Sequence, residues 1–149
     1  MVTTWKNKVD MYKYCIDLHN YTLGRATNIS VSDCNITDSR CILMPGRNAL
    51  LSVEFMPYVD VEQVYVRMYS VVSTVTVPLS LKTPDVCKDP NSGIQCPLTK
   101  DHKYKYNNTI VIHEGFPYFF LDIMLEFVNG GGEAIVCILI PVQIGTLSK

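Results

Sequence analysis

The histidines and two spaced carboxylates are the side chains that could support catalysis or metal binding. His19, His102 and His113 are scattered without ligand spacing, and the sequence has no G-x-S-x-G or H-E-x-x-H motif. Asp122 and Glu126 stand four positions apart, about 13 Å along a strand, which exceeds the usual separation of a glycosidase pair. We therefore predict no enzyme, no catalytic residue and no metal site, and interpret the two carboxylates as part of a solvated face.

His113 is the histidine with a possible role at a binding site. It follows the apolar residues Ile110 to Ile112 and enters the turn "EGFP". Such a histidine either forms a hydrogen bond at the rim of a pocket or is an exposed turn residue. Both interpretations stay open at the level of the sequence.

The cysteines favour disulfide bonds. There are six, an even number, with no C-x-x-C pair among them, at positions 15, 34, 41, 87, 96 and 137. This pattern argues against zinc and against thioredoxin-like redox chemistry, and full pairing would leave no thiol nucleophile. The alternative is that they are buried, reduced core residues.

Four N-glycosylation sequons support an oxidising, secretory environment. The candidate residues are Asn20, Asn28, Asn35 and Asn107. We expect a secreted, extracellular protein or one of the lysosomal lumen. No apolar signal-peptide region is visible in the first 15 residues, so residues 1–14 are interpreted as an N-terminal extension or an expression remnant.

Length and charge limit the class of protein further. A chain of 149 residues predicts one domain, residues 1–149. With 13 Lys and Arg against 14 Asp and Glu, the chain has no basic surplus for nucleic acid. Its apolar runs are shorter than the roughly 20 residues of a transmembrane helix, so no transmembrane segment is expected.

Alternating apolar residues predict β-strands. Residues 48–55, 75–81 and 119–127 are apolar at every second position, which indicates strands with one buried face. Residues 61–72 and 134–144 are apolar on both faces, as covered strands are. The segment "NGGGE" lacks the Lys-Ser or Lys-Thr of a phosphate loop and is interpreted as a hairpin turn. These features predict an all-β sandwich.

Several phrases, taken in order, resemble one known family. They are "YKYC", "SDCNITDSRC", "VCKDPNSGIQCPLTKDHKYKY", "EGFP" and "VCILIPVQIG". Together they are similar to the MD-2-related lipid-recognition (ML) family, and in particular to its Niemann-Pick type C2 branch of sterol and lipid carriers. The resemblance extends from about Cys15 to Ile144.

The resemblance implies an immunoglobulin-like β-sandwich of two antiparallel sheets with a hydrophobic cavity between them. It also implies three disulfides: Cys15 to Cys137, Cys34 to Cys41, and Cys87 to Cys96. The first would join the start of the fold to its last strand, and the other two are local clips.

The cavity wall is also carried over from the resemblance. Its expected members are Val71, Val77, Leu79, Ile112, Phe116, Leu125 and Ile138. The period-2 pattern adds Leu51, Val53, Leu121 and Ile123. For these stripes, ordinary core packing is the alternative.

The expected wall differs from that of vertebrate sterol carriers. Leu79 stands where they have Phe, Leu125 and Ile138 where they have Trp, and Phe116 where they have Tyr. More aliphatic walls suit an acyl chain at least as well as a sterol and resemble arthropod members of the family. The head group is expected near Ser73, Thr74 or His113.

The function implied is that of a passive carrier. Its partner would be a fatty acid, a sterol or a related semiochemical lipid, with no other cofactor, and a membrane or receptor would accept the lipid. Two alternatives remain. One is an immune or receptor accessory module that uses the aromatic surface of "YKYN", residues 104–107, and the tyrosines at positions 65, 69 and 118. The other is an adhesion sandwich without a cavity.

Overall fold

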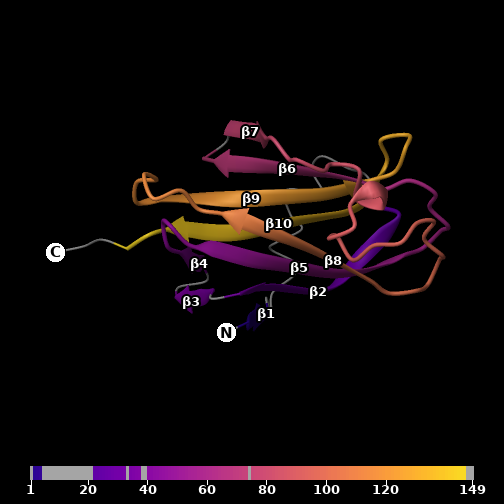
Figure 1. Ribbon diagram of the computed structural model, residues 1–149, viewed down its shortest axis with the longest axis horizontal. Coiled ribbons are helices and arrows are strands. Elements are labelled where there is room, and N and C mark those ends of the chain that lie inside the picture. The colour runs from indigo at the N-terminus through magenta and orange to yellow at the C-terminus, as the bar shows by residue number, and fades with distance from the viewer. Residues whose placement is uncertain (1, 5–21, 33, 38–39, 74, 147–149) are drawn as a thin grey trace.

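Two β-sheets stacked face to face make up most of the regular structure (Figure 1). The computed structural model describes residues 2–4, 22–32, 34–37, 40–73 and 75–146. The strands are β1 (Val2–Thr4), β2 (Gly24–Ser32), β3 (Asn35–Thr37), β4 (Arg40–Leu43), β5 (Asn48–Pro57), β6 (Tyr65–Val72), β7 (Val75–Leu79), β8 (Tyr104–Val111), β9 (Phe119–Val128) and β10 (Ala134–Ile144). Within the described ranges, the one helical element is a 3-10 turn, η1 (Val86–Lys88).

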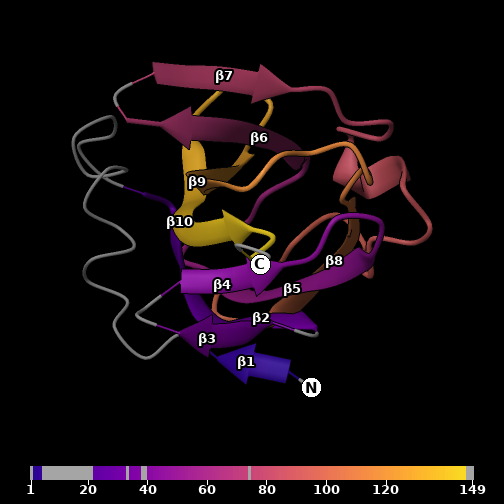
Figure 2. The ribbon, with the colours of Figure 1, turned by 90° about the vertical axis from the view of Figure 1, so that its left-hand side faces the viewer.

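One sheet has four strands and the other has six. Their orders are β1-β2-β5-β8 and β3-β4-β10-β9-β6-β7. All the strand pairs but one are antiparallel among the described residues, the exception being β10 and β4, where Val142 lies opposite Cys41 in parallel. The prediction of two purely antiparallel sheets was therefore wrong for this pair. Because β4 and β10 are far apart in the sequence, no hairpin signal announces their pairing (Figure 2).

The strands expected from alternation are all present. In β5, Ala49, Leu51, Val53 and Phe55 are buried, while Leu50 between them is exposed. The hairpin expected at "NGGGE" joins β9 to β10: the Asn129 amide donates to the Glu133 carbonyl oxygen at 2.9 Å. The period-2 rule therefore located these strands.

Strand β2 was not predicted, because its sequence, "GRATNISVS", is largely polar and its pairing with β5 changes register midway. A bulge between Ala26 and Asn28 interrupts its pairing with β5, so the buried residues do not alternate regularly along the sequence. Ile29 and Val31 nevertheless lie in the core.

An aromatic cluster joins the two sheets. Phe127 of β9 stacks on Phe55 of β5 with ring centroids 4.9 Å apart. It also meets the ring of Tyr106 of β8 edge-on at 5.0 Å. Since Phe127 comes from the six-stranded sheet and its two partners from the four-stranded sheet, these contacts hold the sheets together.

Two of the predicted disulfides are formed. Cys34 pairs with Cys41 and Cys87 pairs with Cys96, with Cα separations of 5.2 and 5.4 Å. Cys137 is buried and disulfide-bonded. Its predicted partner, Cys15, lies outside the described residues, so that pairing stays a prediction.

The outer face of the six-stranded sheet is less solvated than expected. Glu126 of β9 is only 4% exposed; it lies opposite Arg67 of β6 in the sheet and forms a hydrogen bond with Tyr69 of the same strand. The interpretation of Glu126 as a solvated residue was wrong, because alternation shows which residues share a face but not whether other parts of the chain cover it.

Candidate functional site

A cleft of about 830 Å³ lies between the edges of the two sheets. Strand β7 is an edge strand of the six-stranded sheet and β8 is an edge strand of the four-stranded sheet (Figures 1 and 2). Residues of both strands line the cleft. Its lining is Leu50, Met68, Leu79, Ser80, Leu81, Lys82, Thr83, Asp89, Asn91, Tyr106, Asn107, Asn108, Thr109, Ile110, Val111 and His113. Because neither edge strand has a further neighbour in its sheet, the inner faces beside them stay accessible.

The cleft combines apolar walls with polar residues. Met68 of β6 and Leu79 of β7 lie side by side as paired residues of neighbouring strands, and Ile110 of β8 supplies a further apolar side chain. Polar side chains come mainly from the segment after β7 and from β8. An apolar hollow with a few convergent polar groups is the usual form of a small-molecule site.

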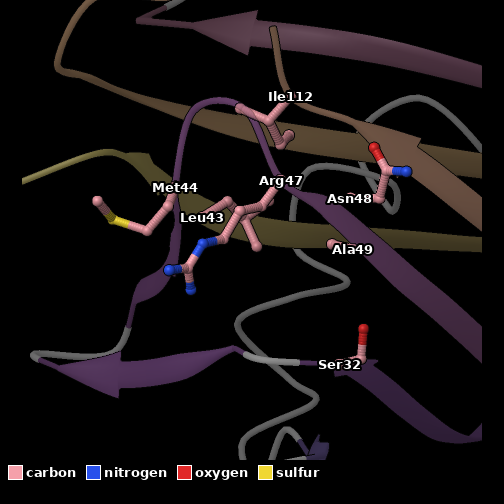
Figure 3. A pocket seen from close by; sticks show the side chains of 7 residues that line it. All are labelled: Ser32, Leu43, Met44, Arg47, Asn48, Ala49 and Ile112. Atoms are coloured by element: carbon pink, nitrogen blue, oxygen red, sulfur yellow. The ribbon is translucent and has the colours of Figure 1, made fainter. Parts of the chain in front are cut away.

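A second pocket is far smaller. It lies near the turn between β4 and β5, and Figure 3 shows Leu43, Met44, Arg47 and Ile112 around it. Its volume is about 30 Å³, enough for roughly one water molecule. It is too small for a lipid. A further hollow of about 790 Å³ is lined by the loop from Cys87 to Cys96 and by Tyr104 alone. The cleft is lined by strands of both sheets and is therefore the candidate site.

The expected wall residues other than Val71 fall into three groups. Leu79 lines the cleft, and Val77, two residues before it on the same face of β7, is 50% exposed beside it. Phe116 is also exposed. The remaining inward-facing residues lie in the core between the sheets, Leu121 being only partly buried; they are Leu51, Val53, Ile112, Leu121, Ile123, Leu125 and Ile138.

Val71 does not join the other expected wall residues. It lies opposite Asp122, on the outer face of the six-stranded sheet, and packs with Met124 and Cys137 in a separate cluster. Its placement in the intersheet wall was therefore wrong. Strand β6 is apolar on both faces, and a shift of one residue reverses which face a side chain occupies.

The residues expected at the head group are also separated. His113 lines the cleft, and its ring meets that of Phe116 edge-on at 5.3 Å. Ser73 is an exposed residue of the β6–β7 turn with a φ of 55°. Thr74 lies outside the described residues. Of the three, His113 has a place in the site.

Sequence reasoning missed most of the polar lining. Asp89 and Asn91 follow η1, and Asn108 lies on β8 next to the core residue Tyr106 in the inward-facing series. The alternation of Tyr104, Tyr106 and Asn108 was a usable signal for β8. Nothing local in the sequence indicated that the loop after η1 reaches the cleft.

Tyr106 is the titratable group most affected by its surroundings. Burial raises its pKa to about 12, the negative charge of Asp89 adds to the rise, and a hydrogen bond with Asn108 opposes it. The hydroxyl therefore stays protonated and neutral at physiological pH.

Outside the cleft, Asp122 lies beside Arg40. Their closest oxygen and nitrogen are 3.5 Å apart, and Arg40 Nη1 also donates to the Leu121 and Val142 carbonyl oxygens. Burial raises the pKa of Asp122 more than the guanidinium lowers it. The pair joins β4 to β9 and β10, which is a structural role.

The sequons differ in their surroundings. Asn28 is exposed on β2, whereas the Asn107 side-chain oxygen accepts a hydrogen bond of 2.8 Å from the Ser52 hydroxyl. Asn20 and the side chain of Asn35 lie outside what the structure describes. Their glycosylation stays a prediction.

Neither a membrane-spanning helix nor a metal centre is found in the described part of the chain. No helix there has the length and apolar character needed to cross a membrane. In the same residues, no group of three or more His, Cys, Asp and Glu side chains is arranged to hold a metal ion.

The chain is similar in sequence to known proteins. The family model described as the ML domain matches residues 10–144. The chain is 29% identical over 121 residues to NPC intracellular cholesterol transporter 2 homolog a of Drosophila melanogaster, a match that covers 81% of this chain and 80% of that protein. It is also 29% identical over 122 residues to the ecdysteroid-regulated 16 kDa protein of Manduca sexta, covering 82% of each.

The fold is similar to a solved structure as well. A Niemann-Pick type C2 protein from the Japanese carpenter ant superposes with a TM-score of 0.77 at 36% identity, covering 82% of this chain and 92% of that one. The family model, the relatives and this structure agree on nearly the whole chain. The chain therefore belongs to the ML-domain family, and it is similar to the Niemann-Pick type C2 members found in arthropods.

Proposed function

We propose that the protein is a carrier that binds one hydrophobic ligand in the cleft between β7 and β8 and transports it. The ligand would be a long-chain fatty acid, a sterol or a related semiochemical lipid. The observation that carries the proposal is the volume and lining of the cleft. Ligand pockets in proteins commonly measure about 300–1,000 Å³, and the cleft of about 830 Å³ falls within this range.

The energetics of apolar burial are sufficient for such a role. Each methylene removed from water contributes about 0.8 kcal/mol. A chain of about 16 carbons therefore gains more than roughly 10 kcal/mol before ordering costs are subtracted. Binding requires no chemistry on the ligand, so we infer a passive carrier that is not an enzyme.

The relatives support the same class of function. The matched Drosophila and dog proteins are named intracellular cholesterol transporters. For this chain we propose action in an extracellular or lysosomal compartment, where disulfides persist. The proposed acceptor of the lipid is a membrane or a receptor.

The first test is to identify the lipid that accompanies the protein. The protein is purified gently from a secretory host, extracted with organic solvent, and the extract is quantified by mass spectrometry per mole of protein. About one equivalent of a fatty acid, alcohol or sterol supports the proposal. An empty extract, followed by no uptake of a fluorescent sterol or fatty acid, contradicts it.

Filling the cleft provides the matched variant. Leu79→Trp places a large ring at the cleft wall, and we expect ligand binding to fall at least tenfold while the melting temperature changes little, because Leu79 is 40% exposed. Val59→Trp adds the same bulk at an exposed position outside the cleft lining and should leave binding unchanged. Retained affinity in Leu79→Trp would place the ligand elsewhere.

The accessory-module alternative has partial support. Tyr118 and Phe120 are exposed and meet edge-on at 5.5 Å, and the Arg40 guanidinium lies 5.2 Å from the centre of the Phe120 ring. Aromatic and arginine side chains are enriched in protein interfaces. Tyr69 and Tyr104, however, pack against core clusters and are not free surface. A lipid-free protein that binds a receptor would favour this alternative.

A further inference from the structure

The polar residues of the cleft are concentrated near η1. Asp89 and Asn91 come from the loop that follows η1, and Tyr106 and Asn108 come from the middle of β8. His113 follows the far end of β8, which ends at Val111. The cleft therefore has a polar end at the η1 loop, defined by Asp89, Asn91, Tyr106 and Asn108.

The position of Asp89 is fixed by hydrogen bonds to Asn91 and Ser92 of its own loop and to Thr83, which precedes η1. Its Oδ1 accepts from the Asn91 backbone amide at 2.9 Å, and its Oδ2 accepts from the Thr83 hydroxyl at 2.9 Å. The buried Ser92 hydroxyl lies 2.9 Å from the Asp89 carbonyl oxygen. These contacts hold the carboxylate in place before any ligand arrives.

The loop itself is attached to β8 and closed by a disulfide. The Asn107 amide donates to the Ser92 carbonyl oxygen at 2.9 Å, and the Cys87–Cys96 bond joins the two ends of the loop. Each side-chain oxygen of Asp89 accepts one hydrogen bond, Oδ1 from Asn91 of the loop and Oδ2 from Thr83, and keeps a free lone pair. A ligand donor can use that remaining capacity.

The two charged side chains near the polar end, Asp89 and Lys82, differ in how deeply they are buried. Asp89 is half-buried and close enough to influence Tyr106, whereas Lys82, the lysine of the cleft lining, is exposed and screened by water. His113 lies at the opposite end of β8. A ligand head group at the polar end therefore meets a negative charge and a neutral phenol.

We propose that Asp89 determines ligand specificity: with Tyr106 and Asn108 it selects a lipid with a neutral hydroxyl head group over a lipid with a carboxylate. This inference rests on the proposed carrier function. The hydroxyl of an alcohol donates a hydrogen bond to the Asp89 carboxylate. Its oxygen accepts a hydrogen bond from the side-chain amide of Asn108 or the hydroxyl of Tyr106. A carboxylate has no proton to donate and is repelled by Asp89.

The test compares ligands that differ only in the head group. 1-Hexadecanol and palmitic acid compete with a fluorescent apolar probe, N-phenyl-1-naphthylamine, at pH 7.5 on the wild-type protein. We expect the alcohol to displace the probe at a concentration at least tenfold lower than the acid. Hexadecylamine, whose ammonium group can donate a hydrogen bond to a carboxylate, should also bind better than palmitic acid. All three ligands are compared on the wild-type protein, so this step needs no variant.

Asp89→Asn removes the charge while keeping an acceptor oxygen for the loop. In this variant we expect the affinity for palmitic acid to rise about tenfold and the affinity for the alcohol to stay within threefold. Glu62→Gln makes the same change in net charge at an exposed position outside the cleft lining. It should keep the wild-type ratio of the affinities for 1-hexadecanol and palmitic acid.

The outcomes separate this inference from the proposed function. Equal affinity for alcohol and acid in the wild type, or an unchanged ratio in Asp89→Asn, overturns the specificity role and leaves the carrier function standing. If no probe or lipid binds at all, both proposals are overturned.

Discussion

Tyr106 combines structural and binding roles in one side chain. Its ring packs edge-on against Phe127 between the sheets, and its hydroxyl belongs to the polar end of the cleft. The raised pKa, about 12, reflects the cost of placing a phenolate in this position. The same burial that excludes the anion makes the neutral hydroxyl a dependable hydrogen-bond donor.

The ionisation of Tyr106 should lower stability at alkaline pH. The unfolded phenol titrates near pH 10 and the folded one near 12, so the stability due to the neutral form is complete below pH 10 and is lost as the pH rises toward 12. The loss from this group is about 1.4 kcal/mol per pH unit within that window. Urea unfolding of the wild type and Tyr106→Phe at pH 8, 10 and 11 measures it.

In Tyr106→Phe, the unfolding free energy should fall less steeply above pH 10 than in the wild type. Tyr69, whose pKa is also raised by burial, is present in both proteins and cancels in the comparison. Parallel curves for the two proteins would contradict the assignment to Tyr106.

At the scale of elements, two edge strands and one loop shape the site. Strands β7 and β8 leave the cleft open because each is the last strand of its sheet. The loop after η1 supplies Asp89, and the Cys87–Cys96 disulfide closes this loop over a sequence separation of 9. We infer that this disulfide positions the polar end as well as stabilising the fold.

Removing the Cys87–Cys96 disulfide tests its effect on the polar end of the cleft and its effect on stability. Cys87→Ser with Cys96→Ser should cost about 2 to 3 kcal/mol in the chain-entropy model for a loop of this length. The same variant should retain probe binding but lose the preference for hexadecanol over palmitic acid. Chemical denaturation and the displacement assay give the two readouts.

The other local disulfide provides a matched control. Cys34 and Cys41 enclose a loop of similar size, with a sequence separation of 7, and neither residue lines the cleft. Replacing both with serine should cost a similar amount of stability and leave the head-group preference intact. Loss of preference in both double variants would indicate general loosening instead of a local effect.

At the scale of the whole molecule, Cys137 lies in β10, which pairs with both β9 and β4. If its partner is Cys15, the bond encloses more than a hundred residues and should contribute about 4 to 5 kcal/mol in the same model. Cys137→Ser should therefore lower the melting temperature more than Cys96→Ser does. Cys15→Ser should reproduce the loss in Cys137→Ser, whereas equal losses in Cys137→Ser and Cys96→Ser would count against this pairing.

The sequence by itself determined five of the strands, β5, β6, β7, β9 and β10, and, through the family resemblance, the two local disulfides. Alternation at Ala49, Leu51 and Val53 marks β5, and the turn residues at 129–133 mark the β9–β10 hairpin, because both signals depend on residues close together in the chain. Family resemblance supplied the Cys34–Cys41 and Cys87–Cys96 pairs, which the structure confirms.

Only the tertiary structure decided which faces meet and where the chain leaves space. Val71 is as apolar as its neighbours, but the register of β6 against β9 places it on the outer face. Leu79 is exposed in the cleft because β7 is an edge strand, and Asp89 reaches the cleft because its loop attaches to β8. Alternation fixes which residues share a face, whereas strand order and sheet edges depend on pairings between distant segments, which no local pattern specifies.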